Sequence, residues 1–355
     1  MEFIKPDVNV NFVGRRRIAF AVSLALIVVG TVALIWRGSS LLGIDFAGGT
    51  IVQVRFEEPT TINRIRQGLQ QAGLSKSAIQ SFGAEGGRVF LIRTEATSSE
   101  LSSLSSRVQQ SLEQLYGKGK AVVERVEMVG PKVGKDLRQK ALLAIYYALL
   151  FIAIYISGRF ELKWMPGLIM AGALILGVYV LRAIGMSIPM LILAALVITL
   201  GCCWFLRLTY ALGAVVALIH DVMITVGAFA LTNKEFDLSV VAALLTIIGY
   251  SLNDTIIVFD RIRENLRKAK RMDFAELINQ SINQTLSRTI LTSGTTIVVV
   301  TALFILGGGV IHDFAFALLV GVIVGTYSSI FVASPVLLAF ERRGVGRGSR
   351  GAKKK

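Results

Sequence analysis

The chain has 355 residues, of which 54% are hydrophobic and 17% charged, and its formal net charge is +15. This composition excludes an ordinary water-soluble globular protein and favours a polytopic helical membrane protein. The basic residues lie beside the apolar runs, as the positive-inside rule expects, so the charge alone does not indicate nucleic acid. The two cysteines, Cys202 and Cys203, are adjacent, which excludes a disulfide framework and offers no metal spacing.

Residues 1–36 contain a short polar segment, a run of arginines at 15–17 and a first apolar span at about 18–36. The arginines predict a cytoplasmic N-terminus. No clear small-residue cleavage site follows the span before Trp36, so we expect a retained anchor and not a cleaved signal peptide.

Residues 37–138 lack long apolar runs and predict a separate domain with its acidic and basic residues nearly balanced, which agrees with an exported position. Six consecutive segments show a regular pattern of apolar residues. Four have the alternation or apolar character of strands, and two have the periodicity of helices. The strands are expected at 50–56, 78–82, 88–93 and 120–129, and the helices at 61–72 and 98–116. The order β-α-β-β-α-β predicts a small ferredoxin-like α+β domain.

Residues 139–340 predict a bundle of transmembrane helices, and we expect about eight spans in the whole chain. After the first, spans are expected at about 139–157, 166–184, 188–206, 209–231, 289–306 and 314–339, with one more beginning at Leu238. The polar segment 259–288 predicts an amphipathic helix along the cytoplasmic face. An even number of spans returns the chain to the cytoplasm, whereas seven would place the basic tail on the wrong side. Six or seven remain open if one run within 166–206 is re-entrant.

The tail at 341–355 is basic and ends in three lysines. We interpret this charge as a signal that keeps the tail in the cytoplasm. A specific contact with acidic lipid headgroups or with ribosomal RNA is the alternative. We expect membrane lipids as partners and no nucleic acid.

The stretch 238–265 begins as a membrane helix and is then interrupted by Ser251, Asn253 and Asp254. An ionisable residue inside a span costs about 2.5–3.5 kcal/mol on insertion scales, so Asp254 should face the bundle. Arg288 is its predicted partner. A carboxylate that approaches and leaves an arginine takes up and releases a proton, which is what coupling to a proton gradient requires. The alternative is a static ion pair between helices.

His220 and Asp221 lie together inside the 209–231 span. They predict either part of a proton relay or a hydrogen-bonded contact between helices. Gly294, Gly321 and Gly325 suit a close approach of helices. The sequence shows no phosphate-binding loop, no nucleophile with a base and no zinc spacing, so we expect no cofactor and no metal, and an enzyme is the least favoured class.

Several stretches resemble the SecD/SecF family of membrane subunits of the bacterial Sec protein-export machinery, and within it the SecF members. Phe-Ala-Gly-Gly-Thr at 46–50, within a signature that includes Asp45, Gly48 and Gly49, resembles the family's motif after the first span. Four further stretches resemble its later spans: 211–222, 248–265, 288–295 and 321–334.

The resemblance implies a bacterial inner-membrane protein with both termini in the cytoplasm, acting in late, proton-driven export of unfolded polypeptide. It implies SecD as a partner, and contact with the SecYEG channel and its accessory membrane subunits. It also implies that Asp254 and Arg288 serve proton conduction at the SecD interface.

The segment 160–207 departs from the family pattern, which passes directly from the second span into the one ending in His-Asp-Val. It predicts an inserted hydrophobic pair added to six family-like spans. Two other functions stay open: a self-contained proton-coupled small-molecule exporter of the resistance-nodulation-division type, and a structural assembly factor in which the Asp254 pair is static. The exporter is disfavoured because one bundle and one small domain should need a partner to form a pathway.

Overall fold

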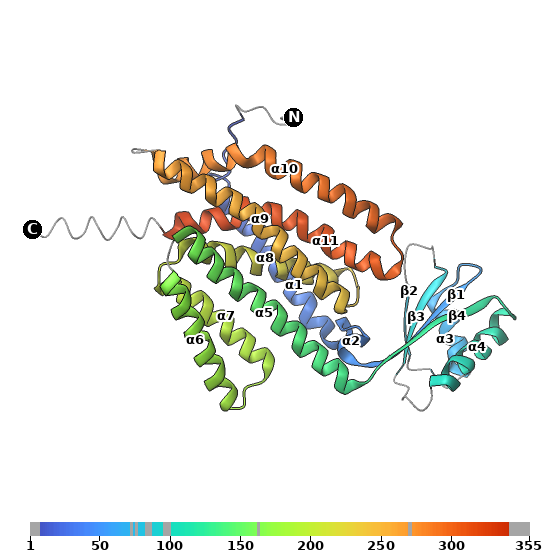
Figure 1. Cartoon of the computed structure of the whole chain (residues 1–355). Helices are drawn as coiled ribbons and strands as arrows, with labels where there is room; N and C mark the ends of the chain where they lie inside the picture. Colours follow the sequence, from blue (N-terminus) through green and yellow to red (C-terminus); the bar gives the residue numbers. More distant parts are fainter. Residues whose placement is uncertain are drawn as a thin grey trace, which may run out of the picture.

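Long apolar runs become helices because a segment surrounded by hydrocarbon must satisfy its backbone hydrogen bonds internally. The computed structural model describes residues 8–340 except 72–73, 75–76, 82–86, 95–100, 162–163 and 269–271. Its long helices are α1 (Arg16–Arg37), α5 (Pro131–Glu161), α6 (Trp164–Ala183), α7 (Ile188–Phe205), α8 (Thr209–Leu231), α9 (Leu238–Lys268), α10 (Phe274–Leu306) and α11 (Gly309–Ser328). They form one bundle, with a small sheet domain at one end (Figure 1).

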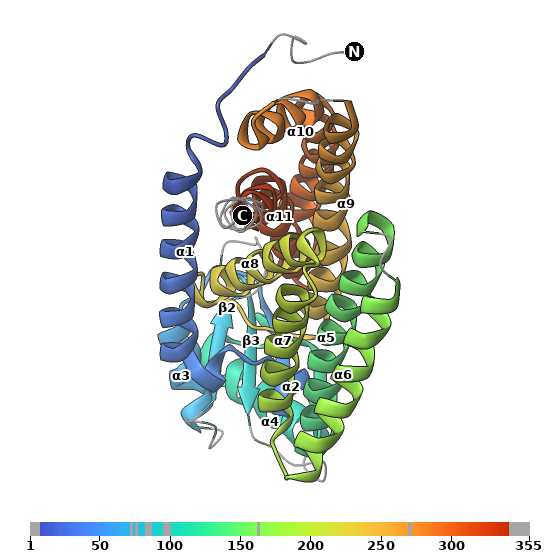
Figure 2. The same cartoon turned by 90° about the vertical axis from the view of Figure 1, so that its left-hand side faces the viewer.

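Seven helices in the described part of the chain are long and apolar enough to cross a membrane. The eighth expected span forms α7, whose apolar part, Met190–Phe205, is shorter than the others. The prediction of a polytopic helical membrane protein is therefore confirmed, with seven candidate spans where we expected about eight. α6 and α7 pack against each other and against α5, and they lie along one side of the bundle (Figure 2).

α8 is the central helix of the bundle and packs against α1, α5, α7, α9 and α11. Helices α1, α6 and α10 turn most of their surface outward, whereas more than half of the apolar window in α8 and α9 is buried. A π-helical turn at Ser329–Ala333 follows α11 and packs on α8 and α9. The two helices with the largest buried share, α8 and α9, therefore lie at the centre of the bundle.

The segment 259–288 differs from its prediction. Its first part completes α9 and its last part begins α10, so it does not form one helix along the membrane face. Asn265 joins the two helices, because its side-chain amide donates to Ser281 Oγ and to Gln284 Oε1, both at 2.9 Å. The segment 259–288 is polar because α9 and α10 both extend beyond their apolar parts there.

The small domain has strands β1 (Gly49–Phe56), β2 (Ala78–Ser81), β3 (Val89–Thr94) and β4 (Ala121–Val129), with helices α3 (Ile62–Gln71) and α4 (Leu101–Tyr116). The predicted β-α-β-β-α-β order is confirmed, and all strand pairs are antiparallel in the order β2-β3-β1-β4. Alternate residues of β1 are buried in a core shared with α3 and α4. The other face of the sheet looks toward the bundle.

A short connection holds the sheet domain to the start of α9. The Gly43 N–H donates to the Phe236 carbonyl at 2.9 Å, and the Phe236 N–H donates to Leu41 at 2.7 Å. Asp45, in the short helix α2 (Ile44–Ala47), accepts a hydrogen bond from the Leu238 N–H at 3.0 Å. Asp45 therefore stabilises the first turn of α9 from within the connection to the sheet.

Gly48 and Gly49 provide the sharp turn from α2 into β1. Their φ angles are +76° and +120°, values that L-residues rarely adopt. A Cβ added to Gly48 would lie 2.9 Å from Pro131 Cα, where α5 begins. The two glycines are therefore needed because β1, α2 and the start of α5 meet at this point.

We expect Gly48→Ala to lower the melting temperature of the purified protein more than Gly119→Ala does. Both positions have left-handed φ angles, for which an L-residue loses roughly 1–2 kcal/mol. A Cβ at Gly119 meets nothing within 4 Å, whereas the one at Gly48 meets backbone that has no room to move. Thermal unfolding in detergent measures the difference, and equal losses would show that the contact with Pro131 is unimportant.

Candidate functional site

Asp221 is the centre of a polar network inside the bundle, and its side chain is only 1% exposed. One carboxylate oxygen lies 2.8 Å from His220 Nδ1. The other accepts hydrogen bonds from Ser251 Oγ at 2.5 Å and Ser328 Oγ at 2.8 Å. Three side chains from α8, α9 and α11 thus compensate one buried carboxylate.

His220 continues this network to α1. Its Nε2 lies 3.0 Å from Ser23 Oγ, and Ser23 Oγ lies 3.0 Å from the Tyr327 hydroxyl. The Tyr327 hydroxyl donates to the Ala19 carbonyl at 2.7 Å, and its ring stacks on the imidazole. Most of these groups both donate and accept, so the predicted pair of His220 and Asp221 belongs to a continuous hydrogen-bonded chain across four helices.

Asp254 forms a second, smaller network on the same helix as Ser251. It is 1% exposed, and its Oδ2 accepts a hydrogen bond from Ser293 Oγ of α10 at 3.2 Å. Thr326 Oγ1 of α11 donates to Ser293 Oγ at 2.7 Å. Because Ser251 and Asp254 are three residues apart, α9 carries one member of each network within a single turn.

The predicted ion pair between Asp254 and Arg288 is not formed in this conformation, since no salt bridge joins these two described residues. Arg288 is exposed on α10 but near enough to act electrostatically on Asp254. Asn253 is also exposed and belongs to neither network. Spacing along the chain predicted a buried Asp254, but the direction of the Arg288 and Asn253 side chains depends on how α9 and α10 pack.

The predicted packing glycines divide into two kinds. A Cβ on Gly325 would lie 2.9 Å from Ser251 Cβ, and one on Gly321 would lie 2.3 Å from Ile247 Cδ1. These two let α11 approach α9 closely enough to position Ser251 near Asp221. Gly294 has nothing within 4 Å of an added Cβ among the described residues, so no neighbouring helix of the described bundle packs closely against it.

Sequence reasoning missed several members of the networks. Ser23, Ser293, Thr326 and Tyr327 were not singled out for hydrogen bonding, although Ser23 lies in an otherwise strongly apolar span. Buried hydroxyls in spans with so few polar residues are a usable signal, because such groups need a partner inside the bundle. The close approach of α1 and α8 at Gly30 and Gly227 was missed as well.

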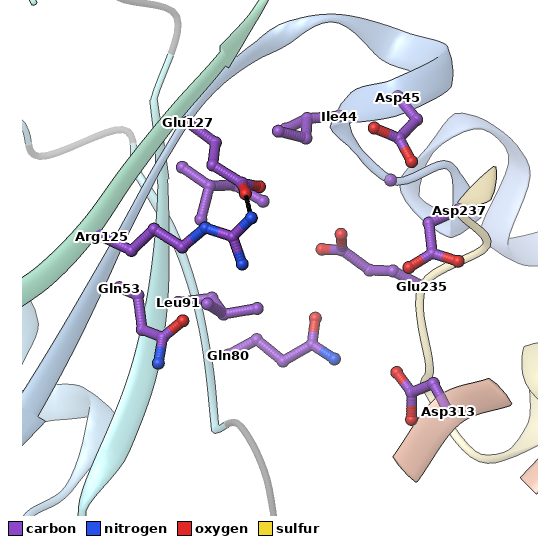
Figure 3. A pocket seen from close by; sticks show the side chains of 12 residues that line it. Ile44, Asp45, Gln53, Gln80, Leu91, Arg125, Glu127, Glu235, Asp237 and Asp313 are labelled. Atoms are coloured by element: carbon purple, nitrogen blue, oxygen red, sulfur yellow. Dashed lines mark ion pairs between the residues drawn. The ribbon is translucent and has the colours of Figure 1, made fainter. Parts of the chain in front are cut away.

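A second polar site lies between the sheet and the bundle, in a cavity of about 110 Å³ (Figure 3). The bundle side contributes four carboxylates, and the sheet side contributes Arg125 in an ion pair with Glu127. The four carboxylates belong to Asp45, Glu235, Asp237 and Asp313. Lys234 Nζ lies 2.5 Å from Asp313 and offsets part of this negative charge.

Burial raises the pKa of both Glu235 and Asp237. For Glu235, Arg93 opposes this rise and Asp237 adds to it. For Asp237, hydrogen bonds from Ser239 and from the Val240 N–H lower the pKa, while Asp45 and Asp313 raise it. Among the described residues, no three His, Cys, Asp or Glu side chains are grouped closely enough to hold a metal ion.

We expect Asp237→Asn to flatten the pH dependence of stability. A carboxyl whose pKa is raised on folding stabilises the folded state at acid pH, and this contribution is lost as pH rises through the folded-state pKa. The Asn side-chain carbonyl still accepts the Val240 N–H at the start of α9, so the helix start is preserved.

The measurement is the melting temperature from about pH 4, near the ordinary pKa of an aspartate, up to about pH 8, over which the parent should lose more stability with rising pH than the variant. Asp136→Asn is the control, because Asp136 is exposed on α5 and pairs with Lys140. A parent and variant with parallel curves would show that Asp237 does not titrate differently in the folded protein.

Comparison with protein families gives two matches. A family model described as protein export membrane protein SecD/SecF, C-terminal, matches residues 108–203 and 186–343. A model of the SecD/SecF GG motif matches residues 42–60, which include Asp45, Gly48 and Gly49.

Curated relatives match over nearly the whole chain. The SecF translocase subunit of Calditerrivibrio nitroreducens is 41% identical over 337 residues, which cover 94% of this chain and 95% of the relative. The SecF subunit of Magnetococcus marinus is 43% identical over 344 residues, with 96% and 95% covered.

Two crystal structures of SecDF share the fold. The structure from Thermus thermophilus has a TM-score of 0.71 and 33% identity, and another, in a super-membrane-facing form, has a TM-score of 0.58 and 33% identity. The similarity covers 96% and 98% of this chain, and this chain spans 40% of each SecDF polypeptide.

Proposed function

The chain belongs to the SecD/SecF family as a SecF protein-translocase subunit, and we propose that it uses the proton motive force, together with a SecD partner, in late steps of protein export. It is a multi-pass transport protein and not an enzyme. Its substrate under this proposal is an unfolded polypeptide that has already entered the export channel. The SecYEG channel and its accessory membrane subunits are the further partners of the same proposal.

The arrangement around Asp254 carries the proposal. In the described structure this buried carboxylate has one hydroxyl donor, Ser293, and a nearby arginine that is not paired with it. Asp221, by contrast, is held by three side chains. A carboxylate with little fixed compensation is suited to exchange its charge for a proton, whereas a fully bonded one is suited to hold helices together.

An exposed polar surface on α9 and α10 supports a partner at this position. Asn253, Arg288 and Thr295 are exposed, and Gly294 between them has open space beside it. Polar and charged groups at membrane depth are costly against lipid and ordinarily face protein or a water-filled cavity. We assign this surface to SecD, and the greater length of the similar SecDF polypeptides agrees with a pathway that needs more than this chain.

Charge supports the proposed orientation. Arginines at 15–17, Arg159 and the basic end of α9 mark the cytoplasmic side, on which both termini would lie. The opposite end of the bundle carries the carboxylates of the cavity and the sheet domain. We therefore place 37–138 outside as an exported, ferredoxin-like domain, with 1–36, 139–340 and 341–355 as the remaining parts of the chain.

The α6–α7 hairpin is proposed as an insertion into a six-span family bundle. The proposal rests on the departure of residues 160–207 from the family pattern, since the matches to the family model, 108–203 and 186–343, cover this segment without a gap. The apolar part of α7 spans about 24 Å at about 1.5 Å per residue, less than the roughly 30 Å hydrocarbon core, so a crossing would need local thinning. If α7 crosses, the chain has eight spans.

Asp254→Asn should abolish the part of export that depends on the proton gradient, because an amide cannot take up or release a proton in this range. The assay is export into membrane vesicles containing this protein and SecD, with co-purification of the two as a check on assembly. Asp260→Asn is the matched control on the same helix, since Asp260 is partly exposed and pairs with Arg159 at 2.7 Å.

Unchanged export by the Asp254→Asn vesicles would make Asp254 structural and direct the search to His220 and Asp221. Loss of export with loss of SecD from the purified complex would also count against a role in coupling.

A cysteine replacing Thr295 should cross-link to SecD, since this exposed position lies on the polar surface of α10. The background replaces Cys202 and Cys203 with alanine. The control is Leu176→Cys on α6, which is 65% exposed and apolar in its surroundings. Cross-linking at Leu176 and none at Thr295 would place SecD against the α6–α7 hairpin instead.

A further inference from the structure

An apolar groove of about 620 Å³ lies on the flank of the bundle between α1, α7, α8 and the end of the last span. Phe20 comes from α1, Leu200 and Trp204 from α7, Leu212 from α8, and Phe340 from the end of the last span. Trp204 packs edge-on against Phe340 with ring centroids 4.6 Å apart. Within its described lining, Arg16 is the one charged residue.

A polar hollow of about 700 Å³ shares one lining residue, Arg16, with this groove. It lies between the N-terminal segment and the first part of α10, and its lining includes Asn279, Gln280 and Asn283, with Glu276 as its carboxylate. Arg16 lines both spaces. Polarity therefore changes from apolar to polar at one guanidinium, as it does along a phospholipid between acyl chain and headgroup.

Arg16 is well placed to bind a phosphate. Its Nη1 donates to the Val13 carbonyl at 3.0 Å, which fixes the side chain while other guanidinium N–H groups stay available for a bidentate contact. It is the first residue of α1, a 22-residue helix whose positive dipole end favours an anion. Arg15 and Arg17 add positive charge on either side.

We propose that this groove binds one anionic phospholipid from the leaflet on the side of Arg16. One acyl chain lies along Phe20, Leu200 and Leu212, and the phosphate contacts the Arg16 guanidinium. Basic pockets between transmembrane helices are known to suit such headgroups. The inference is independent of proton coupling, and it gives α7 a role, because α7 supplies one wall of the groove.

The occupant is argued from polarity and charge together. A purely apolar helix would leave the guanidinium without an anion, and a zwitterionic lipid would add a cation beside three arginines. An anionic lipid places an acyl chain in the apolar groove and a phosphate beside Arg16, which also lines the polar hollow.

The test uses the fluorescence of Trp204 in the purified full-length chain, after Trp36 and Trp164 have been replaced by phenylalanine so that Trp204 is its remaining tryptophan. Phosphatidylglycerol with brominated acyl chains is added in detergent and compared with brominated phosphatidylcholine. We expect quenching at a concentration of phosphatidylglycerol at least about tenfold lower, because both headgroups offer a phosphate to Arg16 but only phosphatidylcholine also brings a cation close to Arg15, Arg16 and Arg17.

Arg16→Gln should remove this preference, while Arg17→Gln, which changes the net charge equally one residue away, should keep it. Native mass spectrometry of both variants checks lipid retention by a second method, and thermal unfolding without lipid checks that each variant folds. Equal quenching by both lipids, or equal loss in the two variants, would overturn the proposal. So would a Trp204 that neither lipid reaches, because the groove would then be covered by protein.

Discussion

The bundle depends on the compensation of one buried charge. In hydrocarbon no water is available to bond with Asp221, so its oxygens require donors from neighbouring helices. Ser251 and Ser328 supply them directly, and His220 extends the bonding to Ser23 on α1. Four helices are thus fixed in register by one carboxylate, and the small residues at Gly321 and Gly325 are needed to bring α11 close enough for Ser328 to take part.

Helix α9 connects this constraint to the rest of the molecule. Its first turn is held by Asp45 from the connection to the sheet domain, and its middle carries Ser251 and Asp254, one from each network. Its far end is joined to α10 through Asn265. A force on the sheet domain would therefore reach both networks through α9. The turn at Gly48 keeps the connection between α2 and the sheet short.

The sequence was most informative where hydrophobicity is the dominant cause. The apolar helices, the β-α-β-β-α-β order and the burial of Asp254 follow from apolar periodicity, which depends on the local chain. The outward direction of Arg288 and Asn253 did not follow, because it depends on how α10 rotates against α9. Ser23 and Tyr327 were missed for a related reason. Ser23 is 197 residues from its partner His220, and Tyr327 is 304 residues from its partner Ser23, so no local pattern joins them.

The two networks differ in which helix supplies their partners. Ser293 and Arg288, the groups that act on Asp254 from outside its own helix, both belong to α10. The partners of Asp221 come from α8, α9 and α11, with none from α10. A displacement of α10 would therefore change the charge compensation of Asp254 and leave the Asp221 network intact. α10 is also one of the helices that turn most of their surface outward, while Asn265, Asn279 and Asn283 tie its first part to α9 and to the N-terminal segment. That arrangement favours a pivot at the tied end, so that movement at the surface proposed for SecD would act first on Asp254.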